Sequence, residues 1–371
     1  MALIKINTRS IPDAAVTPAK VSQNLGRRNL FINSAMKVSQ RGTSFTAVEA
    51  AAYHLDRWNS MISGVNSKGI CTISQDNDAP SGFSKSLKVV VTTADTSLDA
   101  WAEYSIQQKL EGQDLQHLCK GTSSTKQVTI SFWVKSSLTG TYILEMLDDD
   151  NSSRHINKSY TINSANTWEY KSITFAGDTS GVLDDDNAKS MTIAWHLAGG
   201  SNFQGGGLQT SWGSLAQTKR QDGQVNFFGT NANTFQITGC QMELGSVATD
   251  FEHRSYGEEL SLCQRYFQVL GGTGSNYTLG SGFTTTTNFF GAGKLIKTMR
   301  SSPSFSHTGA ASNFSYTHAA VAANASTSPT FTTNPNTFYL SMASSTTTTN
   351  NAGAYARITN SGTLAFFDSE L

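Results

Sequence analysis

This sequence is poor in charged residues, and its two kinds of charge balance. Only 15% of its 371 residues are charged, and the 27 basic side chains equal the 27 acidic ones. A general nucleic-acid binder needs a basic excess to contact phosphates, so the balance excludes that role. No run of roughly 18 apolar residues occurs, which excludes a membrane-spanning helix. The opening residues MALIKINTRSIPD also lack the apolar centre of a signal peptide.

Cysteine and histidine are few and scattered. No CxxC pair occurs, and the seven histidines show no metal-ligand spacing, so a zinc site is not expected. We interpret the cysteines as buried free thiols of a protein made in a reducing cytoplasm. They are Cys71, Cys119, Cys240 and Cys263.

Glycine and aromatic residues, in contrast, are plentiful. The chain holds 31 Gly and a visible excess of Ser, Thr and Asn, a composition that disfavours helices and suits short strands joined by turns. The 20 Phe, 11 Tyr and 6 Trp supply enough apolar surface to exclude disorder. The length exceeds twice that of a typical domain, so two or three folded units are expected.

Residues 1–28 differ from the rest, because they are basic and contain no aromatic residue. Such a segment is either a flexible tail or an arm that orders against a partner protein. Apolar anchors, which a solvating tail would lack, favour the attachment arm. They are Ile4, Ile6, Ile11, Val16 and Val21.

Residues 29–254 show the alternation of β-strands. In the clearest run, Val128, Ile130, Phe132 and Val134 share one face. Further strands are expected at 87–93, 101–110, 142–147, 168–175, 191–197 and 235–244. Many short strands without regular helices between them predict a jelly-roll β-sandwich. All six tryptophans lie in this region, which indicates one domain with its own core.

Residues 255–272 predict a linker helix. Ser255 and Glu258 fit a capping box, and Leu260, Cys263, Phe267 and Leu270 recur at helical spacing. The pair Gly271-Gly272 would end the helix. Residues 273–371 are then almost uncharged and rich in Thr and Asn, with aromatic residues spaced as in strand cores, which predicts a small C-terminal β-domain whose surface makes contacts.

Two motifs carry a family resemblance. They are NLFINSAMKVSQRGTSF at 29–45, followed by HLDRW at 54–58, and GCQMELGSVATDFEHRSYGEELSLCQRYF at 239–267. Together they resemble a group of phage tail-fibre and virion-associated proteins with a carbohydrate-binding-module-like jelly roll. The opening IKINTRSIPDAAVTPAKV is similar to their virion-attachment segments, and LAFFDSEL to their last strand. The resemblance implies a homotrimer that attaches to other virion proteins. From its residues alone, the second motif is interpreted as a structural latch, with Glu252 and Arg254 placed to pair.

Acidic runs offer a candidate metal site. DDDN occurs at 148–151 and at 184–187, beside strand ends and among turn-forming residues. Solvated turn tips explain such runs, and calcium bound by Asp148, Asp150, Asp184 and Asp186 is the alternative. No other cofactor is expected. A glycosidase carboxylate pair is a third interpretation. Nucleophile-elbow, phosphate-loop and HExxH motifs are absent, so we expect no enzyme.

Aromatic residues offer candidate sugar contacts, since pyranose rings stack on aromatic faces. Trp195, Phe203 and Trp212 are the candidates, because the last two lie in or near a glycine-rich loop. For Trp133, whose neighbours alternate cleanly, a core position is expected.

These expectations combine into a phage virion protein, namely a tail-fibre subunit that attaches through its N-terminus and contacts a host-surface glycan. The alternatives are a glycan-degrading tailspike, or a head-decoration or tail-adaptor protein without a receptor role.

Overall fold

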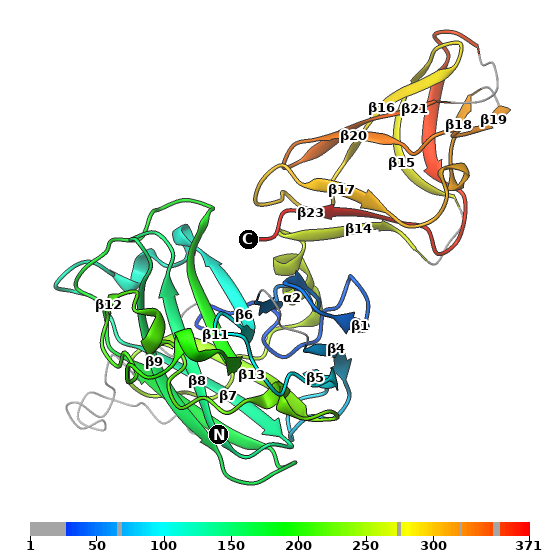
Figure 1. Ribbon diagram of the computed structural model, residues 1–371. Helices are drawn as coiled ribbons and strands as arrows, with labels where there is room; N and C mark the ends of the chain where they lie inside the picture. Colours follow the sequence, from blue (N-terminus) through cyan, green and yellow to red (C-terminus); the bar gives the residue numbers. More distant parts are fainter. Residues whose placement is uncertain (1–26, 65–68, 273–275, 319–320, 344–348) are drawn as a thin grey trace, which may run out of the picture.

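The computed structural model describes residues 27–64, 69–272, 276–318, 321–343 and 349–371. They form two β-sheet bodies joined by a short helix, as Figure 1 shows. The mainly β fold is therefore confirmed. The arm residues predicted to attach to a partner lie outside the described residues. No helix within the described ranges is long and apolar enough to cross a membrane.

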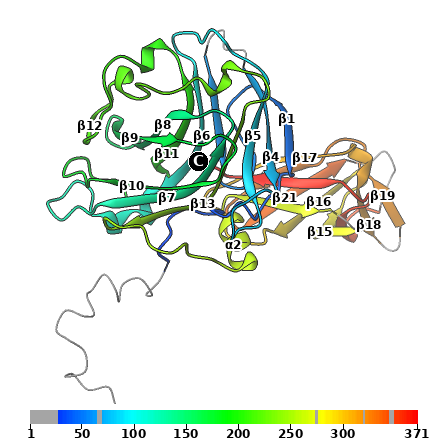
Figure 2. The ribbon, with the colours of Figure 1, turned by 90° about the horizontal axis from the view of Figure 1, so that it is seen from below.

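The larger body is a sandwich of two antiparallel sheets, seen as separate layers in Figure 2. Sheet 1 has the order β1-β4-β5-β13-β7-β10. Its strands are β1 Ser44–Val48, β4 Ile70–Asp76, β5 Ser86–Thr93, β7 Val128–Ser136, β10 Glu169–Phe175 and β13 Thr234–Leu244. Sheet 2 has the order β12-β9-β8-β11-β6-β3-β2. Its strands are β2 Ala52–Tyr53, β3 Asn59–Ser63, β6 Glu103–Glu111, β8 Gly140–Asp148, β9 Arg154–Ile162, β11 Lys189–Gly199 and β12 Gly213–Ser214.

Alternation along the strands builds the core between the sheets. Ile130, Phe132 and Val134 of β7 are fully buried there, as their pattern predicts. Trp133, between them, points to the outer face of sheet 1 and is only partly buried, so the core position expected for it is wrong. The Phe132 ring meets the Trp195 ring of β11 edge-on at 5.7 Å between centroids.

Residues 29–36 are buried as a plug at one end of this core. The Phe31 ring lies 6.2 Å from Trp58 and 5.6 Å from Trp195. The Asn29 amide donates to the Cys240 carbonyl at 3.0 Å and its oxygen accepts the Met242 N–H at 3.1 Å. The first motif is thus a structural element that closes the sandwich against β13.

The segment after β13 is the latch that its sequence predicts. Thr249 donates its N–H (2.9 Å) and its hydroxyl (2.6 Å) to Glu243, and the Glu252 N–H donates to Gln241 (2.8 Å). Arg254 donates to the Phe31 carbonyl at 2.9 Å and lies 3.4 Å from Glu252, as expected. The latch therefore binds both β13 and the plug.

The linker helix is shorter than predicted. Helix α2 spans Tyr256–Cys263, and the Ser255 hydroxyl caps it by accepting the Glu258 N–H at 3.2 Å. Phe267 and Leu270, predicted to be helical, lie instead on strand β14, Phe267–Gly271. The reason is a distant partner, because β14 pairs with β23, Leu364–Asp368, about a hundred residues later.

The smaller body holds two antiparallel sheets around its own aromatic core. Sheet 3 has the order β14-β23-β17, and sheet 4 has the order β19-β18-β22-β15-β16-β21-β20. The remaining strands are β15 Tyr277–Thr284, β16 Asn288–Lys294, β17 Ser304–His307, β18 Phe314–His318, β19 Val321–Asn324, β20 Thr330–Thr333, β21 Thr337–Ala343 and β22 Gly353–Ile358. Single 3-10 turns are η1 Gly112–Asp114, η2 Gln116–Leu118, η3 Ser201–Phe203, η4 Gln217–Lys219, η5 Phe227–Gly229 and η6 Ala311–Asn313.

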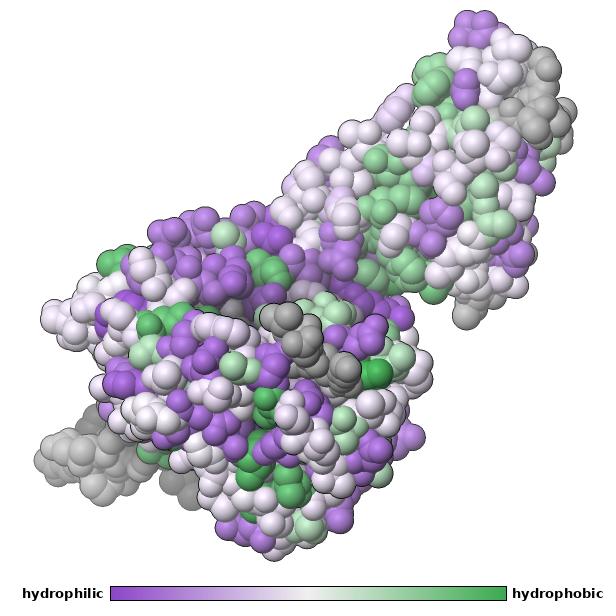
Figure 3. Space-filling model, in the orientation of Figure 1, coloured by the Kyte–Doolittle hydropathy of each residue, from purple (hydrophilic) through white to green (hydrophobic). Residues whose placement is uncertain are grey.

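Charged side chains fix the two bodies to each other, and Figure 3 shows hydrophilic residues gathered where they meet. Arg57, which is 1% exposed, pairs with Glu370, and its guanidinium lies 3.4 Å from the centre of the Tyr266 ring. Arg41 pairs with Asp368 at 3.0 Å. The first motif, which contains Arg41 and Arg57, thus anchors the smaller body as well as closing the sandwich.

Candidate functional site

A loop folded over the outer face of sheet 2 builds a pocket. The chain leaves β11 at Gly199-Gly200, and η3 then packs on the turn before β6. The Gly200 N–H donates to the Ala102 carbonyl at 2.8 Å, and the Asn202 N–H to the Ala100 carbonyl at 2.9 Å. A Cβ at Gly200 would lie 1.9 Å from the Asp99 carbonyl oxygen, so only glycine permits this approach.

The close approach places two aromatic rings side by side. Trp101 precedes β6, and its ring meets the Phe203 ring of η3 edge-on at 5.8 Å. Trp101 is 51% exposed, whereas Phe203 is buried beneath it. The Asp99 carboxylate accepts the Trp101 N–H at 2.8 Å and so fixes the turn that presents the indole.

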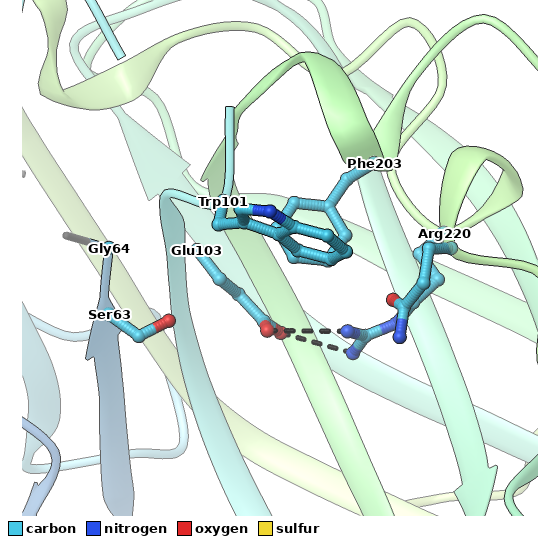
Figure 4. A pocket seen from close by; sticks show the side chains of 7 residues that line it. Ser63, Gly64, Trp101, Glu103, Phe203 and Arg220 are labelled. Carbon is cyan, nitrogen blue, oxygen red and sulfur yellow. Dashed lines mark hydrogen bonds and ion pairs between the residues drawn. The ribbon is translucent and has the colours of Figure 1, made fainter. Parts of the chain in front are cut away.

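The pocket beside these rings has a volume of about 380 Å³. Figure 4 shows Trp101 and Phe203 above a paired Glu103 and Arg220. Arg220 binds the Glu103 carboxylate with both terminal nitrogens, at 3.0 and 3.3 Å. The complete lining is Ser63, Gly64, Trp101, Glu103, Phe203, Gln217 and Arg220.

A second carboxylate holds Arg220 from below. Glu145 of β8 is fully buried and accepts from Arg220 at 2.7 Å, from His155 at 2.9 Å and from His196 at 3.0 Å. Burial alone would raise the pKa of Glu145, but Arg220 and then the two histidines outweigh burial and hold that pKa well below its usual value. The Ala216 N–H donates to His155 Nε2 at 3.3 Å, so His155 contacts Glu145 through its Nδ1–H.

This network holds the polar groups of the pocket floor in fixed positions. Arg220 donates hydrogen bonds to both Glu103 and Glu145, so its guanidinium joins the two carboxylates in one network. Their arrangement suits binding: an exposed indole face stacks on a sugar ring while fixed polar groups at its edge meet hydroxyls.

The three residues predicted to contact a sugar lie in three different environments. Trp195 is fully buried between the sheets, so its ring offers no face to a ligand and that prediction is wrong. Phe203 lines the pocket. Trp212 lies outside it, where the indole N–H donates to the Ala176 carbonyl at 2.8 Å and the ring packs near Lys120. Trp101 was missed, although a tryptophan directly after the turn residues Asp99-Ala100 could have signalled exposure.

The acidic loops do not form the calcium site that was the alternative to solvated turn tips. The two DDDN loops do lie side by side, since the Asp184 N–H donates to Asp150 at 3.0 Å. However, Asp148 is fully buried and paired with Lys120, whose ammonium also lies 3.1 Å from Asp178. Lys120 thus supplies the positive charge that a calcium ion would bring to these carboxylates. The described part of the chain contains no group of three metal-ligating side chains. Asp186 instead accepts the Ala188 N–H at 2.8 Å in its own turn.

The four cysteines are free, as predicted. Cys71, Cys240 and Cys263 are buried, and Cys119 is only partly so.

No family model matches the chain, and no curated protein sequence matches it. Among solved structures, the enzymatically active domain of bacteriophage CBA120 tailspike protein 4 aligns with a TM-score of 0.30 and 14% identity, over 51% of this chain and 20% of that one. The family 11 carbohydrate-binding module of a Clostridium thermocellum cellulosomal cellulase aligns with a TM-score of 0.29 and 14% identity, over 56% of this chain and 97% of the module. At these scores neither the activity of the tailspike nor the ligand of the module transfers to this chain.

Proposed function

We propose that this chain is a glycan-binding structural subunit of a phage tail fibre. The observation that carries the glycan part is Trp101, half-exposed over a pocket whose polar floor is fixed by Glu103 and Arg220. The virion part is supported by the two motifs that resemble tail-fibre proteins. In this proposal residues 1–28 attach the subunit to the particle, the subunit is a homotrimer, and the host-surface glycan is its partner.

Binding rather than cleavage is the proposed activity. Glu103 and Glu145 share one arginine, and Glu145 is fully buried and does not line the pocket, so it cannot contact a bound sugar. A rigid floor with an open aromatic face instead lowers the ordering cost of binding.

The test is a glycan-binding measurement on the full chain and on Trp101→Ala. Stacking that removes roughly 80 Å² of apolar surface from water contributes about 2 kcal/mol, so the variant should bind about 30-fold more weakly. The matched control is Trp168→Ala, which should bind normally. Trp168 is partly exposed, directly precedes β10 and does not line the pocket. Equal affinity of Trp101→Ala and the unmodified chain would refute the site.

Two further measurements address the rest of the proposal. A reducing-sugar assay on the bound polysaccharide should detect no release, and new reducing ends would overturn the non-enzymatic assignment. Sedimentation at micromolar concentration should show a trimer, and a monomer would contradict the fibre assignment.

A further inference from the structure

A second groove lies on the opposite face of the sandwich, on the outer side of sheet 1. Its volume is about 520 Å³, larger than that of the Trp101 pocket. Its lining consists of Phe83, Ser131, Trp133, Tyr170, Gly239, Ala248, Thr249, Asp250 and Phe251. No residue of this groove belongs to the Trp101 pocket.

One wall is a cross-strand aromatic pair. Trp133 of β7 stands directly opposite Tyr170 of β10, and their ring centres are 5.4 Å apart. Tyr170 is 46% exposed. Within the described residues, neither the Trp133 indole N–H nor the Tyr170 hydroxyl has a hydrogen-bond partner, so both groups remain available to a ligand.

The other wall is a second aromatic pair that the fold holds in place. Phe83 and Phe251 meet edge-on at 4.9 Å. Gly239 lies at a bulge in β13 with φ +60°, and a Cβ there would come within 2.5 Å of the Phe83 ring, so glycine makes room for this wall. Phe251 lies inside the latch between Thr249 and Glu252, both of which are hydrogen-bonded to β13.

The rest of the lining is polar or small. Ser131 and Asp250 add a hydroxyl and a carboxylate that accept no hydrogen bond from any described residue, and Ala248 is the largest aliphatic side chain present. Cationic side chains are absent from the residues that line the groove. Ring faces combined with uncommitted donors and acceptors suit a polyhydroxylated ligand, while the single negative charge disfavours an anionic one.

We infer that this groove is a second binding site, specific for neutral hexopyranose oligosaccharides. The inference does not depend on the Trp101 pocket binding a glycan. A protein or peptide contact fits less well, since the groove has no large aliphatic side chain for a peptide to meet.

The experiment titrates the full chain with neutral linear tetrasaccharides (cellotetraose, maltotetraose and laminaritetraose) and with tetragalacturonate, and follows binding by calorimetry and ligand-observed NMR. Trp101→Ala should still bind at least one neutral tetrasaccharide. Adding Tyr170→Ala or Trp133→Ala to it should weaken that binding at least about tenfold. Tyr170→Ala removes an exposed side chain from the edge strand β10, so its fold should survive, and an unchanged melting temperature verifies this.

The outcomes separate this inference from the proposed function. Loss of all binding in Trp101→Ala alone would overturn the second site and leave the first intact. Binding that survives in Trp101→Ala and disappears with Tyr170→Ala supports the groove even if the first pocket binds nothing. Preference for tetragalacturonate, or displacement of the sugar by a polyproline decapeptide, would overturn the assignment. Binding that appears only after residues 1–26 are deleted would show that the chain's own N-terminal segment is the occupant, and would also overturn it.

Discussion

Replacing Glu145 by glutamine tests the buried network under the Trp101 pocket most directly. The carboxylate accepts hydrogen bonds from His155, His196 and Arg220, all three of which are buried. Glutamine has nearly the same size, but it carries no charge, and its NH₂ group is a donor. At least one of the three donors would therefore face another donor.

The expected cost is large for a change that preserves volume. Arg220 keeps Glu103 as a partner in Glu145→Gln, yet the cluster loses one negative charge at a fully buried position. Removing one partner of a buried ion pair costs about 3–5 kcal/mol, because the remaining charge stays desolvated. An isolated domain is stable by only about 5–15 kcal/mol, so the variant should approach the limit of folding.

Urea unfolding at pH 7, followed by tryptophan fluorescence, measures this loss as a change in the free energy of unfolding. Asp76→Asn is the control, because the Asp76–Lys88 pair is on the surface and should contribute no more than about 1 kcal/mol. If Glu145→Gln costs as little as the control, the network does not hold Arg220 as argued.

Four other predictions address the remaining features. Because the pKa of Glu145 is lower in the folded chain than its ordinary 4.5, its contribution to stability is complete above about pH 4.5 and is lost as the pH falls below it; Glu145→Gln should weaken this acid dependence in unfolding titrations. Ser255→Ala removes the cap of α2 and should lower the free energy of unfolding by about 1 kcal/mol, whereas a change below the error of a urea titration would contradict the capping role. Glu370→Gln leaves Arg57 buried without its charged partner, so calorimetry should show the two bodies melting separately, and a single unchanged transition would refute the role of the Arg57–Glu370 pair in fixing the two bodies to each other. Burial raises the pKa of Cys71 to about 12, so a thiol reagent at pH 8 should modify the partly exposed Cys119 of the native chain first, as mass spectrometry can determine.

The sequence predicted local features well, because these depend on neighbours along the chain. The alternation at 128–134 identifies β7, and Ser255 marks the start of α2, since both signals reside in a few consecutive residues. The end of α2 was not predictable in the same way. Phe267 and Leu270 match helical spacing, but their strand partner lies in β23, and no local pattern reports such a pairing.

The candidate site was harder to predict, because a loop changes which faces are buried. Alternation places Trp195 between the sheets and His196 outside, yet both are fully buried, since the 200–226 loop covers sheet 2. The sequence predicted a strand that begins at Trp101, but β6 begins at Glu103, and the exposure of Trp101 depends on how Gly200 meets Asp99 across a hundred residues. The aromatic groove likewise requires Phe83, Trp133 and Phe251 to meet from three distant segments.

The smaller body begins and ends at one place, with a consequence for how it can be exchanged. Phe267, on its first strand, stands directly opposite Asp368, on its last. A domain whose first and last strands are neighbours in one sheet could be attached at these two positions. The distance between its two attachment points would then stay the same. Arg41 and Arg57, which bind Asp368 and Glu370, belong to the sandwich. A grafted domain would need acidic side chains at these two positions, and a counterpart of Arg300 to contact Asn187, to be held in the same orientation. The sandwich therefore provides one attachment site, at which another domain of this kind could take the place of the smaller body.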